Sequence, residues 1–250
     1  MSPAAPRPLA TRLASVLDEI AAEPDPQAMA GLTPAAVLVV LRDPQAEGRP
    51  AAATRPQVQP VTADHVSAEG AAPFGALGRL RVLLTRRRAQ LRRHAGEVAF
   101  PGGRRDDSDG SLLETALREA EEEIGLARER VLPLGALGVA HTLSTNYAVY
   151  PVVALLRDGP RPEAEAAAAS RQAAGQERSV AARTWRLSEE EVESVLELSL
   201  DELEGGRARQ RLTRRGFTFE TDVFQIGEDL IWGLTQRVID DLLQRVQRAA

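Results

Sequence analysis

The chain has 250 residues, 43% of them hydrophobic, and a formal net charge of −5 at pH 7. It can bury a sizeable core, and the mild charge excludes a polycation for nucleic acid or an acidic tail. The absence of Cys excludes disulfides, thiolate zinc sites and cysteine nucleophiles. No apolar run is long enough to cross a bilayer and residues 1–17 lack the apolar core of a secretory signal, so we expect a cytoplasmic protein without a membrane partner.

The first third of the chain predicts one helix and two strands. Residues 12–23 form a helical pattern, and the short apolar runs at 35–43 and 81–87 are typical of buried strands. Between the strands, residues 44–77 are rich in Pro, Ala, Gly and polar side chains and predict a long loop. The apolar stripe of the helix consists of Leu13, Val16, Leu17 and Ile20.

The middle of the chain predicts a capped helix over residues 112–124. Ser111 followed three residues later by Glu114 is a capping box, and Gly125 is a natural helix end. Before the helix, residues 96–103 end in a double glycine, which lets the backbone turn tightly and approach a ligand. The predicted core-facing residues of the helix are Leu113, Leu117, Ala120 and Ile124.

The remaining sequence adds strands and a closing helix. Residues 131–140, 147–158 and 217–226 predict strands, 185–187 a short strand, and 188–206 a helical or mixed segment. Residues 160–184 are Ala-rich and predict an insertion. The amphipathic helix at 231–248 carries an apolar stripe. Strands on both sides of a central helix, with a second helix at the end, predict an α/β sandwich with helices on both faces of the sheet.

The central helix concentrates negative charge on one turn. Glu119, Glu122 and Glu123 are related as i, i+3 and i+4, and therefore cluster on one face. A solvated face is one reading, because each like-charge pair costs only about 0.2–0.5 kcal/mol. A cation site is the other, because clustered carboxylates repel unless a cation lies among them, and hard oxygens suit Mg²⁺ or Mn²⁺. Arg118 is placed to orient such a carboxylate.

Gly103 and the run from Arg118 to Leu126 resemble the Nudix box, G-x5-E-x7-R-E-U-x-E-E-x-G-U, in which U is a bulky apolar residue. Two departures stand out: Ala120 occupies an apolar position, and the spacing from Gly103 to Arg118 is one residue longer than in the box. No Glu occupies the first-Glu position; Asp106, Asp107 and Asp109 lie in that loop instead.

The preceding segment resembles the signature of the coenzyme A pyrophosphatase branch of Nudix hydrolases, L-L-T-x-R-[S/A]-x3-R-x3-G-x3-F-P-G-G. Arg88 departs from it, since it stands where the signature has Ser or Ala. The matching residues are Leu83, Leu84, Thr85, Arg87, Arg92, Gly96, Phe100, Pro101, Gly102 and Gly103.

The resemblance implies a Nudix-type α/β/α sandwich with a mixed sheet and metal-dependent hydrolysis of the pyrophosphate bond of coenzyme A or its thioesters. The products would be 3',5'-ADP and 4'-phosphopantetheine or its acyl form. It also implies Mg²⁺ or Mn²⁺ held by Glu119, Glu122 and Glu123, with Arg118 as a fourth catalytic residue. The alternatives are the same reaction on another nucleoside diphosphate derivative, such as NADH, a nucleotide sugar or capped RNA, and a non-catalytic ligand sensor.

The implied substrate contacts are Arg87 and Arg92 from the basic run at 86–94, together with Gly102 and Gly103. The other members of that run, Arg86, Arg88 and Arg93, are expected to be solvated, and His94 to be a polar loop residue. Glu191 is a candidate for a later acid in the site, with a surface glutamate as the alternative reading.

Two units are predicted along the chain: an N-terminal helical segment at 1–30 and a Nudix domain at 31–250, with insertions at 44–77 and 160–184. The expected partner is a small-molecule substrate. We expect no nucleic-acid partner beyond the capped-RNA alternative, and the sequence is compatible with a homodimer.

Overall fold

The computed structural model describes residues 8–21, 31–45, 73–91, 94–142, 146–157, 185–214 and 216–250. The expectations for Arg92, for Arg93, for most of the loop at 44–77 and for the insertion at 160–184 therefore lie outside the described residues.

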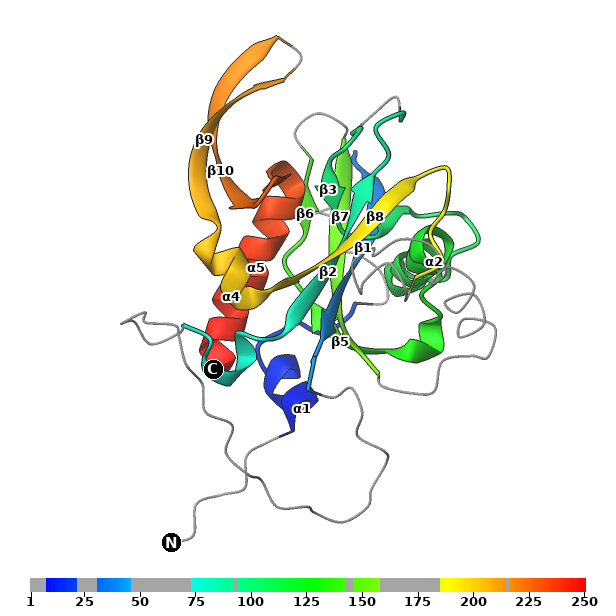
Figure 1. Ribbon diagram of the computed structural model, residues 1–250. Helices are drawn as coiled ribbons and strands as arrows, with labels where there is room; N and C mark the ends of the chain where they lie inside the picture. The colour runs from blue at the N-terminus through cyan, green and yellow to red at the C-terminus, as the bar shows by residue number, and fades with distance from the viewer. Residues whose placement is uncertain are drawn as a thin grey trace, which may run out of the picture.

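An eight-stranded mixed sheet forms the centre of the molecule (Figure 1). Its main path runs β3 (Val98–Ala99), β2 (Arg81–Arg87), β1 (Thr33–Arg42), β7 (Tyr147–Leu156) and β5 (Val131–Ala136). Three further strands pair with this path: β4 (Gly102–Arg104) with β1, β6 (Ala140–His141) with β7, and β8 (Val192–Ser199) with β2. The pairing of β1 with β7 is parallel, and the other pairings are antiparallel.

The sequence of β1 is almost continuously apolar because both faces of this strand are covered. Successive side chains of a strand point to opposite faces. Leu38 and Val40 pack into the apolar cluster on one face of the sheet, and Val39 and Leu41 pack into the cluster on the other. A strand that is covered on both faces has no polar side to present to solvent.

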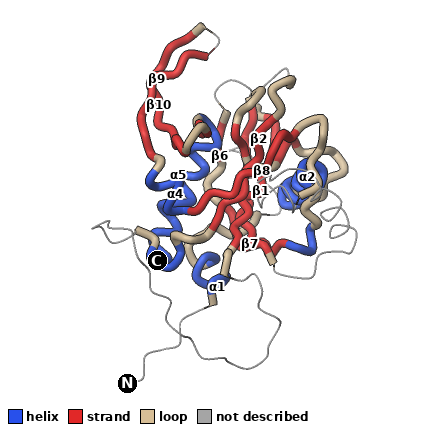
Figure 2. The backbone as a smooth tube through the Cα atoms, in the orientation of Figure 1, coloured by secondary structure: helices blue, strands red, loops and turns tan. Residues whose placement is uncertain are grey.

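Helices cover the two faces of the sheet unequally (Figure 2). Among the described residues, α2 (Leu112–Ile124) is the α-helix that packs against one face. The opposite face is covered by α5 (Gly233–Ala249), with the short helices α1 (Leu9–Ala14) and α4 (Leu200–Gly205) beside it. The predicted α/β/α sandwich with a mixed sheet is confirmed.

The N-terminal helix is shorter than predicted. It ends at Ala14 rather than near residue 23, and the chain then turns so that Asp18 forms an isolated bridge with Ala136 at the edge of the sheet. The Asp18 carboxylate accepts hydrogen bonds from Arg245 of α5 at 2.8 and 3.0 Å. Pairing with the sheet and with α5 therefore replaces the second half of the predicted helix.

Three other expectations need correction. Residues 185–187 form no strand, because Arg186 N–H donates to Ile124 O at the end of α2. The mixed segment at 188–206 is resolved into β8 followed by α4. The predicted loop at 44–77 ends in core residues, since Phe74 and Leu77 are buried in the same apolar cluster as α5.

A second, three-stranded sheet lies beside α5. It consists of β9 (Arg207–Arg214), β10 (Phe217–Ile226) and β11 (Asp229–Ile231), in the order β11-β10-β9. The strand at 217–226 was predicted, whereas the arginine-rich β9 was not. In Figure 1 the β9–β10 hairpin, drawn in orange, extends beyond the rest of the molecule.

Candidate functional site

The two ends of α2 are set by local sequence, as predicted. The Ser111 side chain accepts a hydrogen bond from Glu114 N–H at 3.2 Å, and Gly125 adopts a left-handed conformation with φ +68° at the other end. In a capping box the Glu114 carboxylate would accept a hydrogen bond from Ser111 N–H. Here it accepts from Gly110 N–H instead, at 2.8 Å.

The buried face of α2 is turned slightly from the predicted stripe. Ala116 and Ala120 are fully buried against the sheet, and their small side chains bring the helix backbone close to β1 and β4. Leu113 and Leu117, predicted to face the core, are only partly buried at its margin. This rotation turns the Glu119 and Glu123 side chains toward the sheet.

The double glycine lies directly beneath these two carboxylates. A Cβ atom on Gly103 would come within 2.6 Å of the carboxyl carbon of Glu119. Gly102 has φ +155°, a Cβ there would lie 2.4 Å from the carbonyl oxygen of Ala36, and its backbone N–H lowers the pKa of the nearby Glu123 carboxyl group. Both glycines are therefore required by close approach, and both contact predicted catalytic residues.

Burial of Glu123 gives its carboxyl group an unusual proton affinity. The residue is 4% exposed, and burial raises its pKa to about 8; Arg87 opposes this shift, and the nearby charges of Glu191 and Glu119 reinforce it. Burial also raises the pKa of Glu119, against the opposing effect of Arg118. The Oε2 atom of Glu123 is buried and has no hydrogen-bond partner among the described residues.

Arg118 organises the acidic groups around it. Its Nε and Nη2 atoms donate to the two carboxylate oxygens of Asp109, each at 2.9 Å, and its Nη1 donates to Glu119 at 3.0 Å and to Glu122 at 3.1 Å. The bidentate pair with Arg118 holds the pKa of Asp109 well below its usual range and raises that of Arg118. Arg118 thus contacts Glu119, the carboxylate beside it that it is expected to orient.

Asp109 is a further candidate residue of the site, one that the sequence indicates only as one of three aspartates in its loop. Its side chain is buried, and besides Arg118 it accepts hydrogen bonds from Thr115 Oγ1 and from Asp106 N–H, both at 2.9 Å. Asp109 lies six positions after Gly103, where the box has its first Glu, so counting from Gly103 would have singled it out among the three aspartates of the loop.

Two residues from other parts of the sheet complete the site. Arg87, at the end of β2, lies with Nη1 3.6 Å from Glu123 Oε1 and Nη2 3.9 Å from Glu191 Oε2. Glu191 precedes β8, and its carbonyl oxygen accepts from Arg88 N–H at 3.0 Å. Half of the Glu191 side chain is exposed, yet its charge raises the pKa of both Glu119 and Glu123. The structure therefore brings the candidate later acid to the carboxylate site.

The remaining members of the basic run behave differently from one another. Arg86, expected to be solvated, forms an ion pair with Asp229 of β11 on the α5 side of the sheet. Arg88 is half-buried rather than solvated, and its Nε atom has no partner among the described residues. His94 forms a contact of 2.7 Å with Glu97, as a polar loop residue does.

The donor set fits a hard divalent cation in part. Among the described residues, no three acidic or histidine side chains converge closely enough to hold a metal ion as they stand. Glu122, which is 60% exposed, accepts a hydrogen bond from the same Arg118 Nη1 atom that donates to Glu119. Glu119 and Glu123 offer desolvated oxygens, one of them without a hydrogen-bond partner, and such oxygens suit Mg²⁺ or Mn²⁺. These two residues would form the core of a cation site.

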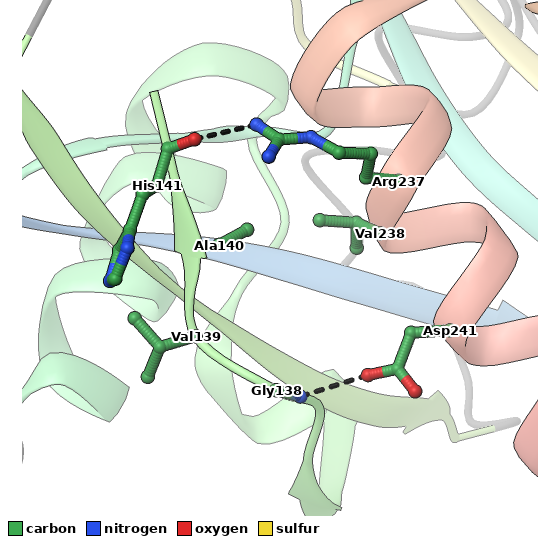
Figure 3. Close-up of a pocket in the computed structure, with 7 residues that line it drawn as sticks. All are labelled: Gly138, Val139, Ala140, His141, Arg237, Val238 and Asp241. Carbon is green, nitrogen blue, oxygen red and sulfur yellow. Dashed lines mark hydrogen bonds between the residues drawn. The ribbon is translucent and has the colours of Figure 1, made fainter. Parts of the chain in front are cut away.

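A hollow of about 320 Å³ lies elsewhere, between α5 and the chain around β6 (Figure 3). Two hydrogen bonds cross it: Gly138 N–H donates to Asp241 at 2.9 Å, and Arg237 donates to His141 O at 2.6 Å. Because α5 and α2 cover opposite faces of the sheet, this hollow is separate from the carboxylate site.

No helix among the described residues is long and apolar enough to cross a membrane.

Comparison with known proteins supplies the family. A NUDIX domain model matches residues 65–216, more than half of the chain. A protein named as an uncharacterized Nudix hydrolase, NudL, from Photorhabdus laumondii is 37% identical over 168 residues, covering 66% of this chain and 77% of the relative. Another NudL, from Citrobacter koseri, is 34% identical over 194 residues, covering 77% of this chain and 88% of the relative.

Among solved structures, the MutT protein from Methanosarcina mazei Go1 is similar with a TM-score of 0.42 and 15% identity, over 86% of this chain and 93% of that one. The matched family model and the two relatives establish that this chain belongs to the Nudix hydrolases, enzymes that act on nucleoside diphosphate derivatives and generally use divalent metal ions.

Proposed function

We propose that this Nudix hydrolase cleaves the pyrophosphate bond of coenzyme A or its thioesters, giving 3',5'-ADP and 4'-phosphopantetheine or its acyl form. The support for this substrate is the signature segment from Leu83 to Gly103, which matches the coenzyme A pyrophosphatase branch at all but one of its specified positions. Arg88 is the departure.

One observation carries the proposal: the signature segment and the acidic helix meet at one place. Gly102 and Gly103, the last residues of the signature, lie against Glu123 and Glu119. Arg87, from the start of the signature, reaches Glu123 and Glu191. A segment that only packed the core would not place both the Arg87 guanidinium group and a pair of closely packed glycines against the same buried carboxylates.

The reaction adds water across a phosphoanhydride. A water oxygen forms a bond to one phosphorus, the bond from that phosphorus to the bridging oxygen breaks, and one proton leaves the water. Glu191 is our proposed acceptor for that proton, because its half-exposed carboxylate lies close to Glu119 and Glu123 without belonging to α2. Arg87 is placed to bind a phosphate oxygen through its planar guanidinium group.

Glu119 and Glu123 would hold the divalent cation, with Arg118 and the two glycines keeping their carboxylates in place. When bound, the cation neutralises phosphate charge and lowers the pKa of a bound water. Arg118, tied to Asp109, donates a hydrogen bond to Glu119 and so restrains its carboxylate. The protein part of the site is in this way largely preorganised.

The test is a substrate panel. Purified protein is incubated with Mg²⁺ or Mn²⁺ and coenzyme A, acetyl-coenzyme A, NADH, a nucleotide sugar, capped RNA and a nucleoside triphosphate, and the products are identified by mass. We expect 3',5'-ADP from both coenzyme A forms at the highest kcat/KM. Intact coenzyme A beside another cleaved compound would overturn the substrate assignment, and no cleavage in the panel would point to the sensor alternative.

The proton acceptor is tested separately with Glu191→Gln. The expected result is a loss of kcat with little change in KM, because Glu191 is proposed to act on the attacking water and not on the substrate. Glu190→Gln, at the neighbouring exposed position, is the matched control. An unchanged kcat in Glu191→Gln would show that Glu191 is a surface glutamate without a role in proton transfer.

A further inference from the structure

The guanidinium group of Arg87 lies between two acidic side chains of the carboxylate site. Its Nη1 atom is 3.6 Å from Glu123 Oε1, and its Nη2 atom is 3.9 Å from Glu191 Oε2. Both separations are those of ion pairs, but they exceed the range of about 2.7–3.2 Å in which an N–H group donates a hydrogen bond to oxygen. Arg87 therefore supplies positive charge to both residues without being held firmly by either.

Arg118 provides a comparison within the same site. Its Nε and Nη2 atoms donate to Asp109 at 2.9 Å each, and its Nη1 atom donates to Glu119 at 3.0 Å. The exposed fractions of the two arginine side chains are nearly equal, 25% for Arg118 and 27% for Arg87. Burial therefore does not explain why one guanidinium group is fixed by hydrogen bonds and the other is not.

Two buried atoms at the contact of Arg87 with Glu123 lack a hydrogen-bond partner among the described residues. They are Arg87 Nε and Glu123 Oε2. Buried polar atoms are nearly always paired, and leaving one unpaired costs free energy. Each residue thus keeps an unused group in this contact: an oxygen of Glu123 that suits a cation, and an N–H of Arg87 that suits an anion.

The backbone of Arg87, unlike its side chain, is firmly held. Its N–H donates to Glu97 O at 2.9 Å, and its carbonyl oxygen accepts from Gly96 N–H at 3.1 Å. The side chain can therefore change its rotamer, and the guanidinium group its position, while the end of β2 stays paired.

We propose that Arg87 supplies the positive charge beside Glu123 and Glu191 until a divalent cation binds at Glu119 and Glu123, and that its guanidinium group then turns to the substrate phosphate. This inference rests on the cation site proposed above. One carboxylate of Glu123 cannot neutralise both a divalent cation and Arg87, so the two positive charges compete for it. A phosphate group offers Arg87 two oxygens at once, which the two separate carboxylates do not.

The movement of Arg87 links the two binding events. A bound cation releases Arg87 for phosphate, and bound phosphate draws Arg87 away from Glu123, so each ligand favours the other. Glu191, the proposed proton acceptor, loses its ion pair at the same moment and can accept the proton of the attacking water.

Proton binding to Glu123 does not reverse this expectation. Arg87 lowers the pKa of Glu123 against the effect of burial, so removing Arg87 also raises that pKa and strengthens competition by protons. A divalent cation carries twice the charge of a proton, and Arg87 therefore repels it about twice as strongly from the same oxygens. The net result of removing Arg87 is tighter cation binding.

Titration with Mn²⁺ alone, followed by the electron paramagnetic resonance signal of free Mn²⁺, tests this inference without turnover. In Arg87→Gln we expect the dissociation constant for Mn²⁺ to fall about threefold or more, the scale of a partly exposed ion pair. Arg87→Lys keeps the charge and should bind Mn²⁺ like the wild type. Arg104→Gln removes an exposed positive charge at the end of β4 and is the matched control, in which the constant should change little.

Binding of ADP at saturating Mn²⁺ is the second measurement, because ADP carries the diphosphate that coenzyme A and NADH share. Arg87→Gln should weaken ADP binding at least about tenfold, as loss of a hydrogen bond to a charged group does, although it binds Mn²⁺ more tightly. A residue that bound only phosphate would change the ADP affinity alone, and a residue that only supported the fold would weaken the binding of both ligands.

Glu123→Gln distinguishes failure of this inference from failure of the cation site. If Glu123→Gln loses Mn²⁺ binding while Arg87→Gln binds Mn²⁺ no more tightly than the wild type, the cation site stands and the role of Arg87 is wrong. An equal gain in Arg104→Gln, or an unchanged ADP affinity in Arg87→Gln, would also overturn that role. If the wild type binds no Mn²⁺, or binds it no better than Glu123→Gln, the cation site is wrong and this inference fails with it. Thermal unfolding checks that every variant is folded.

Discussion

The Glu123 carboxyl group is buried close to the charges of Glu119 and Glu191. The informative substitution at this position therefore changes its charge and keeps its shape. Glu123→Gln keeps the size of a side chain that, with its pKa raised to about 8, is largely uncharged at neutral pH when no cation is bound, so the fold should be retained. Without a charged ligand at this position, we expect hydrolysis to fall by at least about 100-fold. Glu121→Gln, exposed on the same helix, should retain full activity in the same assay.

The pair of Asp109 and Arg118 contributes to stability in a pH-dependent way. Arg118 holds the pKa of Asp109 below its ordinary value, so the folded state favours the ionised carboxylate. This contribution is complete above a pH of about 4, the ordinary pKa of Asp, and is lost as the pH falls below it.

We therefore expect Asp109→Asn to lower the free energy of unfolding by about 2 kcal/mol at neutral pH, since a buried, charge-assisted hydrogen-bond pair is broken. The difference from the wild type should shrink when urea unfolding is measured near pH 3. Asp107→Asn, exposed in the same loop, is the control and should have little effect at either pH. A difference that stayed constant with pH would contradict the ionised pair.

At the scale of elements, the spacing between β4 and α2 decides the geometry of the site. A methyl group on Gly103 would occupy the place of the Glu119 carboxyl group, which is the flexible end of a side chain. Gly103→Ala should therefore displace Glu119 while leaving β4 paired, so activity should fall at least about tenfold, with thermal unfolding little changed. A Cβ atom on Gly205 would have no other heavy atom within 4 Å, so Gly205→Ala serves as the control. Full activity of Gly103→Ala would show that Glu119 has another productive position.

Most long elements could be predicted because their apolar periodicity is local. The strands β1, β2, β5, β7 and β10 and the helices α2 and α5 lie where the pattern places them. The strands β3, β4, β6 and β11 have only two or three residues each, too few for a period. β9 alternates arginine with other residues, and its strand conformation follows from pairing with β10, a contact that its own sequence does not indicate.

At the scale of the molecule, the N-terminal segment described here is tied into the sandwich. Leu13 is 1% exposed within the cluster that contains α5. Leu13→Ala should therefore lower the free energy of unfolding by about 3 kcal/mol in a single cooperative transition. Thr11→Ala, exposed on the same helix, should change it little. If the segment at 1–30 were an independent appendage, urea unfolding of Leu13→Ala would leave the main transition where it is in the wild type.

The sequence by itself determined the chemistry that this chain carries. The helix caps, the carboxylates on one turn of α2 and the glycine pair before it are local features, and residues within a few positions of one another specify them. Only the tertiary structure decided which groups meet them. Asp109 reaches Arg118 across a loop, while Arg87 and Glu191 arrive from β2 and from the residue before β8. It also left Glu122 exposed while Glu119 and Glu123 face the sheet, because close packing of two alanines against the sheet set the rotation of α2 about its axis.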